Sequence, residues 1–362
     1  MVPLSQVMWL LALTTVARAV ISPKVFIINF YNDEQNVWLG IPDFNLLEQN
    51  ITLPNLSMLF PDIHCTVDGS VCQLITGEAE INAATSTTAL VLAPQFNLTQ
   101  TYFLLAGVAG INPKVGTIGS VAFAQFAVQV ALQYEIDAQV FQLNDALRQK
   151  AIDFAKTATL NDSTSAQAYR QLYANQSDYA PALAGPSVLA CDTATSDVWW
   201  SGDLLGAAFE NTTRLLTNGS ATYCTSQQED NAVLESLLRG HVAGRVDFSR
   251  VIDMRIGSAF DRQGENMSVA ENLFNGQSAG YDAGLLNIYL AGVKVVEGIL
   301  QGWNTTFEQG VPAQNYIGDV FGSLGGTPSF GPGSIFNDSG APAASQTVKQ
   351  NTATSGAVMS VR

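Results

Sequence analysis

The sequence has little histidine and little basic charge. Two histidines, His64 and His241, in 362 residues make a metal site or a Ser-His-Asp triad improbable, so carboxylates are the expected general acids and bases. The motifs G-x-x-x-x-G-K-[ST] and H-E-x-x-H are absent. Sixteen Lys and Arg against thirty-one Asp and Glu give a net charge of −15. This balance disfavours nucleic acid and anionic membrane surfaces as partners.

Long apolar runs are also scarce. A run of about eighteen apolar residues, the length that a transmembrane helix needs, occurs nowhere after residue 20. The segment that comes nearest, 284–300, is interpreted as a helix docked within a folded domain, so we expect no stable membrane span. A short apolar stretch near the start is followed by Ala17-Arg18-Ala19. Because this is a small-x-small signal peptidase site, residues 1–19 are predicted to be a signal peptide rather than an anchor.

Features typical of the secretory pathway support that prediction. Ten asparagines stand two residues before Ser or Thr without an intervening proline, where chance would supply roughly three or four: Asn50, Asn55, Asn97, Asn161, Asn175, Asn211, Asn218, Asn266, Asn304 and Asn337. The stretch CTVDGSVC favours a local disulfide between Cys65 and Cys72, which leaves Cys191 and Cys224 to pair, although four cysteines allow two other connectivities. We expect a glycoprotein that is secreted or held at the cell wall or surface.

Apolar strands alternate with amphipathic helices along the chain. Strands buried on both faces are predicted at 24–30, 89–92, 102–106, 121–124, 187–190 and 251–255, and helices at 144–156, 229–238 and 281–300. This alternation is typical of an α/β domain with a largely parallel sheet. From Gly325 the sequence is rich in Gly, Pro, Ser and Ala. We therefore expect the domain to span 20–324 and residues 325–362 to form a low-complexity, disordered tail.

Four segments place acids or glycines next to predicted strand and helix ends. Asp33 and Glu34 follow the first strand, where open α/β sheets place their ligand crevice. LITGEAEINAA combines a glycine, two acids and a predicted helix start, and Glu229 with Asp230 begins another helix, where the helix dipole alone favours a carboxylate. The fourth segment, 102–124, has four glycines within thirteen residues. They indicate either sharp turns or close approach of a ligand to the backbone.

These motifs resemble those of the fungal purine nucleoside permease family. The matching segments are PKVFII, NLLEQNITLP, PDIHCTVDG, CQLITGEAEINAA, YFLLAGVAGINPKVGTIGSVAFAQFAVQVALQYEID, TLNDS, CDTATSDVWW, YCTSQQEDNAVLESLL and IGSAFDRQ. More distantly, the arrangement is similar to nucleoside phosphorylases and nucleosidases. The resemblance implies a single three-layer domain around a twisted central sheet, purine nucleosides as ligands, and a homo-oligomer as one option. It implies no cofactor, with phosphate as the one potential co-substrate.

The resemblance also implies which residues bind the nucleoside. In the related enzymes a Gly-rich strand end lies against the ligand, and the corresponding residues here are Gly107, Val108, Ala109 and Gly110. Gln228-Glu229 stands where those enzymes have a Met-Glu pair whose glutamate holds the ribose hydroxyls. A carboxylate in that place would orient the sugar through charge-assisted hydrogen bonds.

The catalytic residues follow from the same resemblance, with two departures. Glu34 matches the acid that positions the attacking water in nucleosidases, and residues 29–38 lack the arginine with which phosphorylases hold phosphate. Hydrolysis is therefore favoured over phosphorolysis. The usual Ser-Asp pair that protonates the departing base is represented by Ser258 followed by Ala259, so Asp261 becomes the candidate acid. The connection from Asp137 to Asn144 is also shorter than is usual, through a true deletion or a gene-model error.

Three functions fit these observations. One is a secreted enzyme that cleaves the N-glycosidic bond, with Glu34 activating water, Glu229 holding ribose and Asp261 as the acid. Another is a non-catalytic nucleoside binder that assists uptake by passing its ligand to a separate membrane carrier. The third is a structural relative that binds nothing. Base release separates the first from the second, and saturable binding separates the second from the third.

Overall fold

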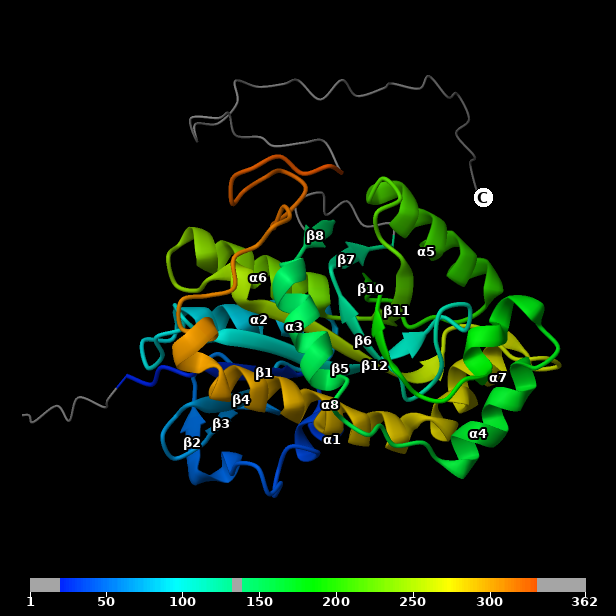
Figure 1. Ribbon diagram of the computed structural model, residues 1–362, viewed down its shortest axis with the longest axis horizontal. Helices are drawn as coiled ribbons and strands as arrows, with labels where there is room; N and C mark the ends of the chain where they lie inside the picture. The colour runs from blue at the N-terminus through cyan, green and yellow to red at the C-terminus, as the bar shows by residue number, and fades with distance from the viewer. Residues whose placement is uncertain (1–19, 132–138, 331–362) are drawn as a thin grey trace, which may run out of the picture.

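The fold is built on one large sheet, seen in a computed structural model that describes residues 20–131 and 139–330 (Figure 1). The strands are β1 Val25–Asn29, β2 Gln49–Thr52, β3 Asp62–Cys65, β4 Val71–Ile75, β5 Tyr102–Ile111, β6 Val121–Ala124, β7 Phe126–Gln129, β8 Val140–Gln142, β9 Val188–Ala190, β10 Asp192–Thr195, β11 Tyr223–Gln227 and β12 Val251–Phe260. The helices are α1 Asn32–Asn36, α2 Ala79–Leu92, α3 Asp145–Ala155, α4 Thr164–Arg170, α5 Asp203–Leu216, α6 Asp230–Val242, α7 Val269–Asn275 and α8 Tyr281–Gln301. The predicted signal peptide, Asp137 with the first residue of the short connection that follows it, and residues 331–362 of the predicted tail lie outside the described residues.

The sheet is mixed. Its strands run in the order β2-β3-β4-β1-β5-β11-β10-β7-β8, while β12 pairs with β5 and β6, and β6 pairs with β9. Of the eleven strand pairs in the described part of the chain, six are parallel and five antiparallel. A largely parallel sheet is therefore not confirmed. Several of the antiparallel pairs join strands that follow each other along the chain, such as β3 with β4 and β7 with β8. A short connection can join only antiparallel neighbours.

Helices cover both faces of the sheet. On one face α2 and α6 pack over β1, β4 and β5, with Leu90 and Leu237 among the buried side chains. On the other face α3 and α8 pack over β5 and β12, with Ile152 and Val296 buried there (Figure 1). β1 supplies both layers because alternate residues of a strand point to opposite faces, Phe26 and Ile28 to one and Val25 and Ile27 to the other. This arrangement fixes β1, β5 and β12, whose carboxyl ends carry the candidate site.

Most of the predicted elements are present, with one clear error. The strand predicted at 89–92 is wrong, because these residues form the last turn of α2. Four apolar residues in a row cannot distinguish a buried strand from a buried helix segment. In α2 the buried residues Ser86, Thr87, Leu90 and Val91 follow helical spacing instead. β5 and β12 extend five residues beyond their predicted ends, and both extensions reach the candidate site.

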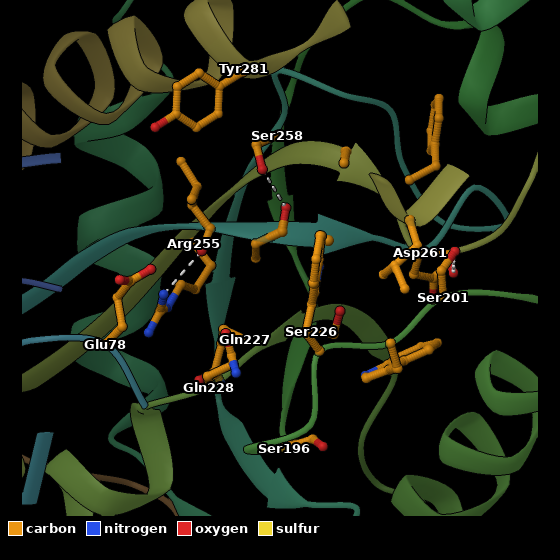
Figure 2. Close-up of a pocket in the computed structure, with 18 of the residues that line it drawn as sticks. Glu78, Ser196, Ser201, Ser226, Gln227, Gln228, Arg255, Ser258, Asp261 and Tyr281 are labelled. Atoms are coloured by element: carbon orange, nitrogen blue, oxygen red, sulfur yellow. Dashed lines mark hydrogen bonds between the residues drawn. The ribbon is translucent and has the colours of Figure 1, made fainter. Parts of the chain in front are cut away.

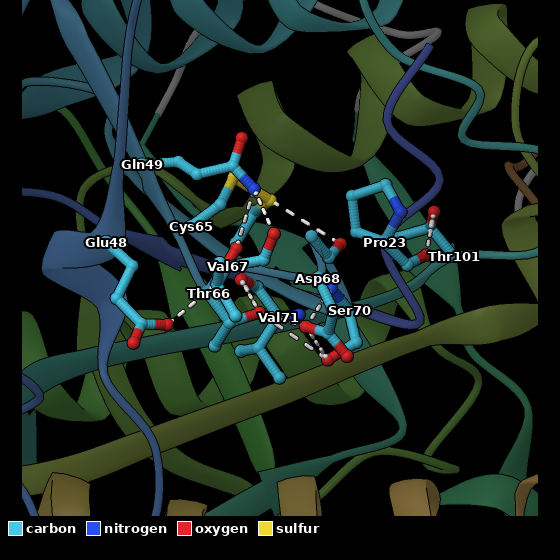
Figure 3. Close-up of a disulfide and its surroundings, with 12 residues drawn as sticks. Pro23, Glu48, Gln49, Cys65, Thr66, Val67, Asp68, Ser70, Val71 and Thr101 are labelled. Atoms are coloured by element: carbon cyan, nitrogen blue, oxygen red, sulfur yellow. Dashed lines mark hydrogen bonds between the residues drawn. A yellow bond between two sulfur atoms is a disulfide. The ribbon is translucent and has the colours of Figure 1, made fainter. Parts of the chain in front are cut away.

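Both preferred disulfides are confirmed. Cys65 pairs with Cys72, and Cys191 with Cys224. The first closes the β3–β4 hairpin, where the Asp68 carboxylate accepts hydrogen bonds from the Thr66 hydroxyl at 2.7 Å and the Ser70 backbone N–H at 3.0 Å (Figure 3). The Gln49 amide, from β2, donates to the carbonyls of Thr66 and Val67 at 2.8 Å. Local turn chemistry and the disulfide together fix this edge of the sheet.

α8 is the one helix, among the described residues, whose length and composition would allow it to cross a membrane. A core helix passes the same test. The buried residues Ile288, Val295 and Ile299 of α8 belong to the core that covers β5 and β12. The helix is thus packed inside the domain, as expected for the 284–300 segment.

Candidate functional site

A cavity of about 790 Å³ opens at the carboxyl ends of β1, β5, β11 and β12 (Figure 2). Eight of the nine residues predicted to form the site line this cavity: Glu34, Val108, Ala109, Gly110, Gln228, Glu229, Ser258 and Asp261. The ninth, Gly107, does not line it. Figure 2 shows Arg255 and Glu78 on one side of the cavity and Asp261 with Ser201 on the other, with Ser226 between them. We call these sides the Arg255 end and the Asp261 end.

The two glycines of β5 provide space within the strand. The sequence predicts a strand that ends at Ala106 before a glycine-rich loop, but β5 continues to Ile111 and contains Gly107 and Gly110. A Cβ at Gly107 would lie 2.6 Å from Arg255 Nη1 and 2.8 Å from Glu34 Oε1. At Gly110 it would lie 2.7 Å from Ser226 Oγ. Glycine is needed here because other side chains approach the backbone closely.

Glu34 is held by backbone donors at the Arg255 end. It lies in α1 and is 1% exposed. Its Oε2 accepts a hydrogen bond from Phe30 N–H at 2.7 Å, and its Oε1 accepts one from Val108 N–H at 2.7 Å. Burial raises the pKa of Glu34 to about 8, against the attraction of Arg255, and the charge of Glu229 acts in the same direction as burial. Glu34 can therefore exchange a proton near neutral pH.

Arg255 joins two buried acids. Its Nη2 donates to Glu229 Oε2 at 3.0 Å and to Asp230 Oδ1 at 2.5 Å, and its Nε donates to Asp230 Oδ1 at 3.1 Å. Its Nη1 donates to the Val108 carbonyl at 3.0 Å, and the guanidinium lies 3.9 Å from the centre of the Phe30 ring. Burial by itself lowers the pKa of Arg255, but the charges of Asp230 and Glu229 outweigh it and raise the pKa. Arg255 is thus a fixed cation that orients these carboxylates.

Glu229 is fixed from its other side by the start of α2. The Ala79 backbone N–H donates to Glu229 Oε1 at 3.1 Å. Ala79 has φ +69°, a left-handed conformation that costs a non-glycine residue about 1–2 kcal/mol. Burial raises the pKa of Glu229, opposed by Arg255 and by this N–H. Glu229, the N-cap residue of α6, is consequently held at the cavity wall by partners from two other elements.

The Asp261 end holds its acid differently. Asp261 follows β12 and is 3% exposed, and its Oδ2 accepts a hydrogen bond from the Tyr223 hydroxyl at 2.6 Å. Its Oδ1 has no hydrogen-bond partner, although Arg262 Nε lies 3.4 Å away. Burial raises the pKa of Asp261 to about 7, against the charge of Arg262 and the Tyr223 hydrogen bond. One buried oxygen of Asp261 is therefore left without a hydrogen-bond donor.

A β-bulge explains where Ser258 and Asp261 lie. In the β12–β5 ladder Gly257 is opposite Ala109 and Ala259 is opposite Gly110, so Ser258 is the extra residue. Its hydroxyl donates to the Ala109 carbonyl at 3.2 Å. Bulges re-aim side chains at the end of a strand. Here Asp261, three residues beyond the bulge at Ser258, lines the cavity.

Aromatic side chains surround the remaining wall. Trp199 and Phe274 make an edge-to-face contact with ring centroids 5.6 Å apart, and both are exposed. On another side the Tyr281 hydroxyl donates to Asp33 Oδ2 at 2.7 Å and lies 3.0 Å from the Tyr31 hydroxyl. Flat aromatic faces are suitable for stacking on a heterocyclic base.

The sequence analysis missed Arg255 and the aromatic wall. A usable signal for Arg255 was present, because a charge inside an apolar strand needs a buried partner. No comparable signal marked Tyr281, which begins α8, or Tyr223, which lies in β11. Their roles depend on contacts with Asp33 and Asp261, far away in the sequence.

The fold is that of nucleosidases. The chain superimposes on the 5′-methylthioadenosine/S-adenosylhomocysteine nucleosidase of Neisseria meningitidis with a TM-score of 0.50 and 12% identity, covering 77% of this chain and 99% of that one. The nucleosidase of the same name from Colwellia psychrerythraea, solved with adenine, gives a TM-score of 0.50 and 14% identity over 77% and 97% of the two chains. At these identities the likeness shows the fold alone.

Sequence comparison identifies the family. The purine nucleoside permease family model matches residues 22–140 and 138–312. A purine nucleoside permease of Candida albicans is 40% identical over 86% of this chain and 84% of its own length. A probable purine nucleoside permease of Schizosaccharomyces pombe is 37% identical over 79% and 92%. The chain belongs to the purine nucleoside permease family.

Proposed function

We propose that this protein binds purine nucleosides in the cavity and hydrolyses their N-glycosidic bond. The observation that carries the proposal is the Arg255 end, where Glu34 and Glu229 face one cavity from fixed positions. The names of the family members and the nucleosidase fold support a nucleoside as the ligand. Glu229 accepts hydrogen bonds from the ribose hydroxyls, which are neutral donors suited to a buried carboxylate.

The raised pKa values of Glu34 and Asp261 suit these two acids to the proton transfers of hydrolysis. Ionised Glu34 takes a proton from a water molecule, whose oxygen forms a bond to the anomeric carbon of the sugar. The bond from that carbon to the base nitrogen breaks, and protonated Asp261 gives its proton to the departing base. The products are the free base and ribose. Glu229 and its neighbours favour the positive charge that develops on the sugar.

The electrostatics of the cavity favour water over phosphate as the nucleophile. Among the described residues that line it, Arg255 is the one Lys or Arg, and its donors are engaged by Glu229, Asp230 and the Val108 carbonyl. Four further acids line the same cavity besides Glu229: Glu34, Glu78, Asp261 and Asp282. A phosphate dianion would meet this negative surface without a free cation.

A second function is favoured by one observation. Ala259 stands in place of the usual acid, and Asp261 reaches the cavity only from beyond the bulge. If Asp261 does not reach the leaving base, the protein binds nucleosides without cleaving them. It would then pass its ligand to a separate membrane carrier, a role consistent with the name permease in its relatives.

We also infer secretion or a place at the cell surface. Of the nine sequon asparagines that the structure describes, eight are exposed and Asn161 is half-buried. Both disulfides are of a kind that persists in oxidising compartments. Mass spectrometry of protein from the culture medium, before and after enzymatic removal of N-glycans, tests this inference.

The proposed hydrolysis is tested with the full chain secreted from a eukaryotic host. The protein is incubated with inosine, adenosine or guanosine, with and without phosphate, and base and sugar are separated by chromatography. We expect base release without phosphate in the wild type and in Asp153→Asn, an exposed α3 control, but not in Glu34→Gln. Strict dependence on phosphate would overturn hydrolysis. Saturable binding without base release would instead support the carrier-linked function.

A further inference from the structure

Asp253 is a buried acid that the proposed reaction does not use. It lies in β12, is 1% exposed and is not part of the cavity wall. Neither of its carboxyl oxygens has a hydrogen-bond donor. Transferring an ionised carboxylate into such a site without a hydrogen-bond donor is very costly, so the group is more stable when neutral.

The residues next to Asp253 include a carboxyl that a neutral Asp253 could donate to. Asp253 and Arg255 are two residues apart in β12 and therefore point to the same face of the sheet. Asp230, which accepts hydrogen bonds from Arg255, is the neighbouring acid that acts most strongly on the pKa of Asp253. A neutral Asp253 can donate its O–H to the Asp230 carboxyl, which an ionised Asp253 cannot do.

Burial and the two neighbouring acids favour a neutral Asp253. Burial is the largest effect and raises the pKa of Asp253 well above the usual range; the charges of Asp230 on α6 and Asp192 on β10 raise it further, and Arg255 on β12 opposes them. Asp192 is also buried but accepts hydrogen bonds from the backbone N–H groups of Gln125, Phe126 and Thr222. Asp192 thus has donors for its charge, whereas Asp253 has none.

We propose that Asp253 is a permanently protonated positioning residue, whose O–H donates to Asp230 and so fixes Arg255 and, through Arg255, Glu229. The chain of contacts runs from Asp253 to Asp230, Arg255 and Glu229, and ends at the cavity. Its last step rests on the proposed function, because Glu229 is there the ribose-binding carboxylate. The protonation of Asp253 does not depend on that function.

The first experiment tests the proton. Infrared spectra in the carboxylic-acid carbonyl region are recorded at about pH 9.5, more than one unit above the pKa of about 8 of Glu34 and of about 7 of Asp261. Both of those acids are then ionised. We expect a protonated-acid band in the wild type that is lost in Asp253→Asn. A spectrum without the band, or a spectrum that Asp253→Asn leaves unchanged, would overturn the proposal.

The second experiment tests positioning. Asn can still donate a hydrogen bond to Asp230, whereas Val cannot, so Asp253→Asn is expected to keep the wild-type nucleoside affinity and pH profile. Asp253→Val is expected to weaken nucleoside binding about tenfold, a typical effect of losing a hydrogen bond to a charged group. Equal binding by the wild type and Asp253→Val would refute the positioning role. If the wild type binds no nucleoside, the proposed function fails, while the infrared result still decides the protonation of Asp253.

Discussion

The two ends of the cavity hold buried acids in opposite ways. At the Arg255 end, Glu229 and Asp230 are hydrogen-bonded to one guanidinium, and Glu34 accepts two backbone N–H groups. At the Asp261 end, one carboxyl oxygen accepts the Tyr223 hydroxyl and the other has no hydrogen-bond partner. The first arrangement fixes geometry, and the second leaves one carboxyl oxygen without a donor. We propose that binding and leaving-group chemistry are separate functions of the two ends.

The largest expected effect concerns the stability of the Arg255 end. Arg255→Met leaves two buried carboxylates without their cation and is expected to lower the free energy of unfolding by about 3–5 kcal/mol. Arg262→Met is expected to cost less, because one of its partners, Glu210, is partly exposed. Urea denaturation followed by circular dichroism measures both variants. Equal losses would contradict the view that the two ends are differently constrained.

The next effect concerns affinity. Glu229→Gln keeps the shape of the side chain but removes the charge that holds ribose, so nucleoside binding is expected to weaken by about ten- to a hundredfold. Titration calorimetry with inosine provides the measurement. Asp178→Asn, an exposed control far along the chain from the site, should leave affinity unchanged. A Glu229→Gln variant with wild-type affinity would remove this residue from the binding site.

The pH dependence of turnover separates the two ends. Glu34 must be ionised to take a proton, so activity rises as pH passes its pKa of about 8, whereas Asp261 must be protonated to give one, so activity falls above its pKa of about 7. The productive form is therefore a minority that is largest near about pH 7.5, midway between the two values. Initial rates from pH 5 to 10 test this bell shape. A flat profile, or activity confined to acid pH, would contradict the assignment.

The smallest expected effect concerns the strained residue that holds Glu229. Ala79→Gly relieves the left-handed strain while keeping the backbone N–H, and is expected to stabilise the protein by up to about 1 kcal/mol. Ala84→Gly, in the interior of the same helix, should instead destabilise it by about 0.5–1 kcal/mol. Thermal unfolding of both variants provides the comparison. Destabilisation by both would mean that Ala79 is not strained.

The sequence predicted several residues of the Arg255 end but not the side-chain contacts that join them. Glu34 follows a recognisable strand and Glu229 begins a recognisable helix, and those local patterns persist in the fold. Gln228 was found through the family resemblance alone. The contacts of Arg255 with Glu229 and of Tyr223 with Asp261 join residues 26 and 38 positions apart. Periodicity carries no information on such pairs. The mixed sheet and the bulge at Ser258 were missed for the same reason, since register is set by tertiary packing.

The most direct test of the separation compares binding with turnover in two variants. Inosine affinity and base release are measured for Asp261→Asn and for Glu229→Gln under the same conditions. The account predicts that Asp261→Asn keeps near wild-type affinity but loses base release, while Glu229→Gln loses affinity. If Asp261→Asn releases base at the wild-type rate, or if both variants lose affinity equally, the assignment of separate functions to the two ends is wrong.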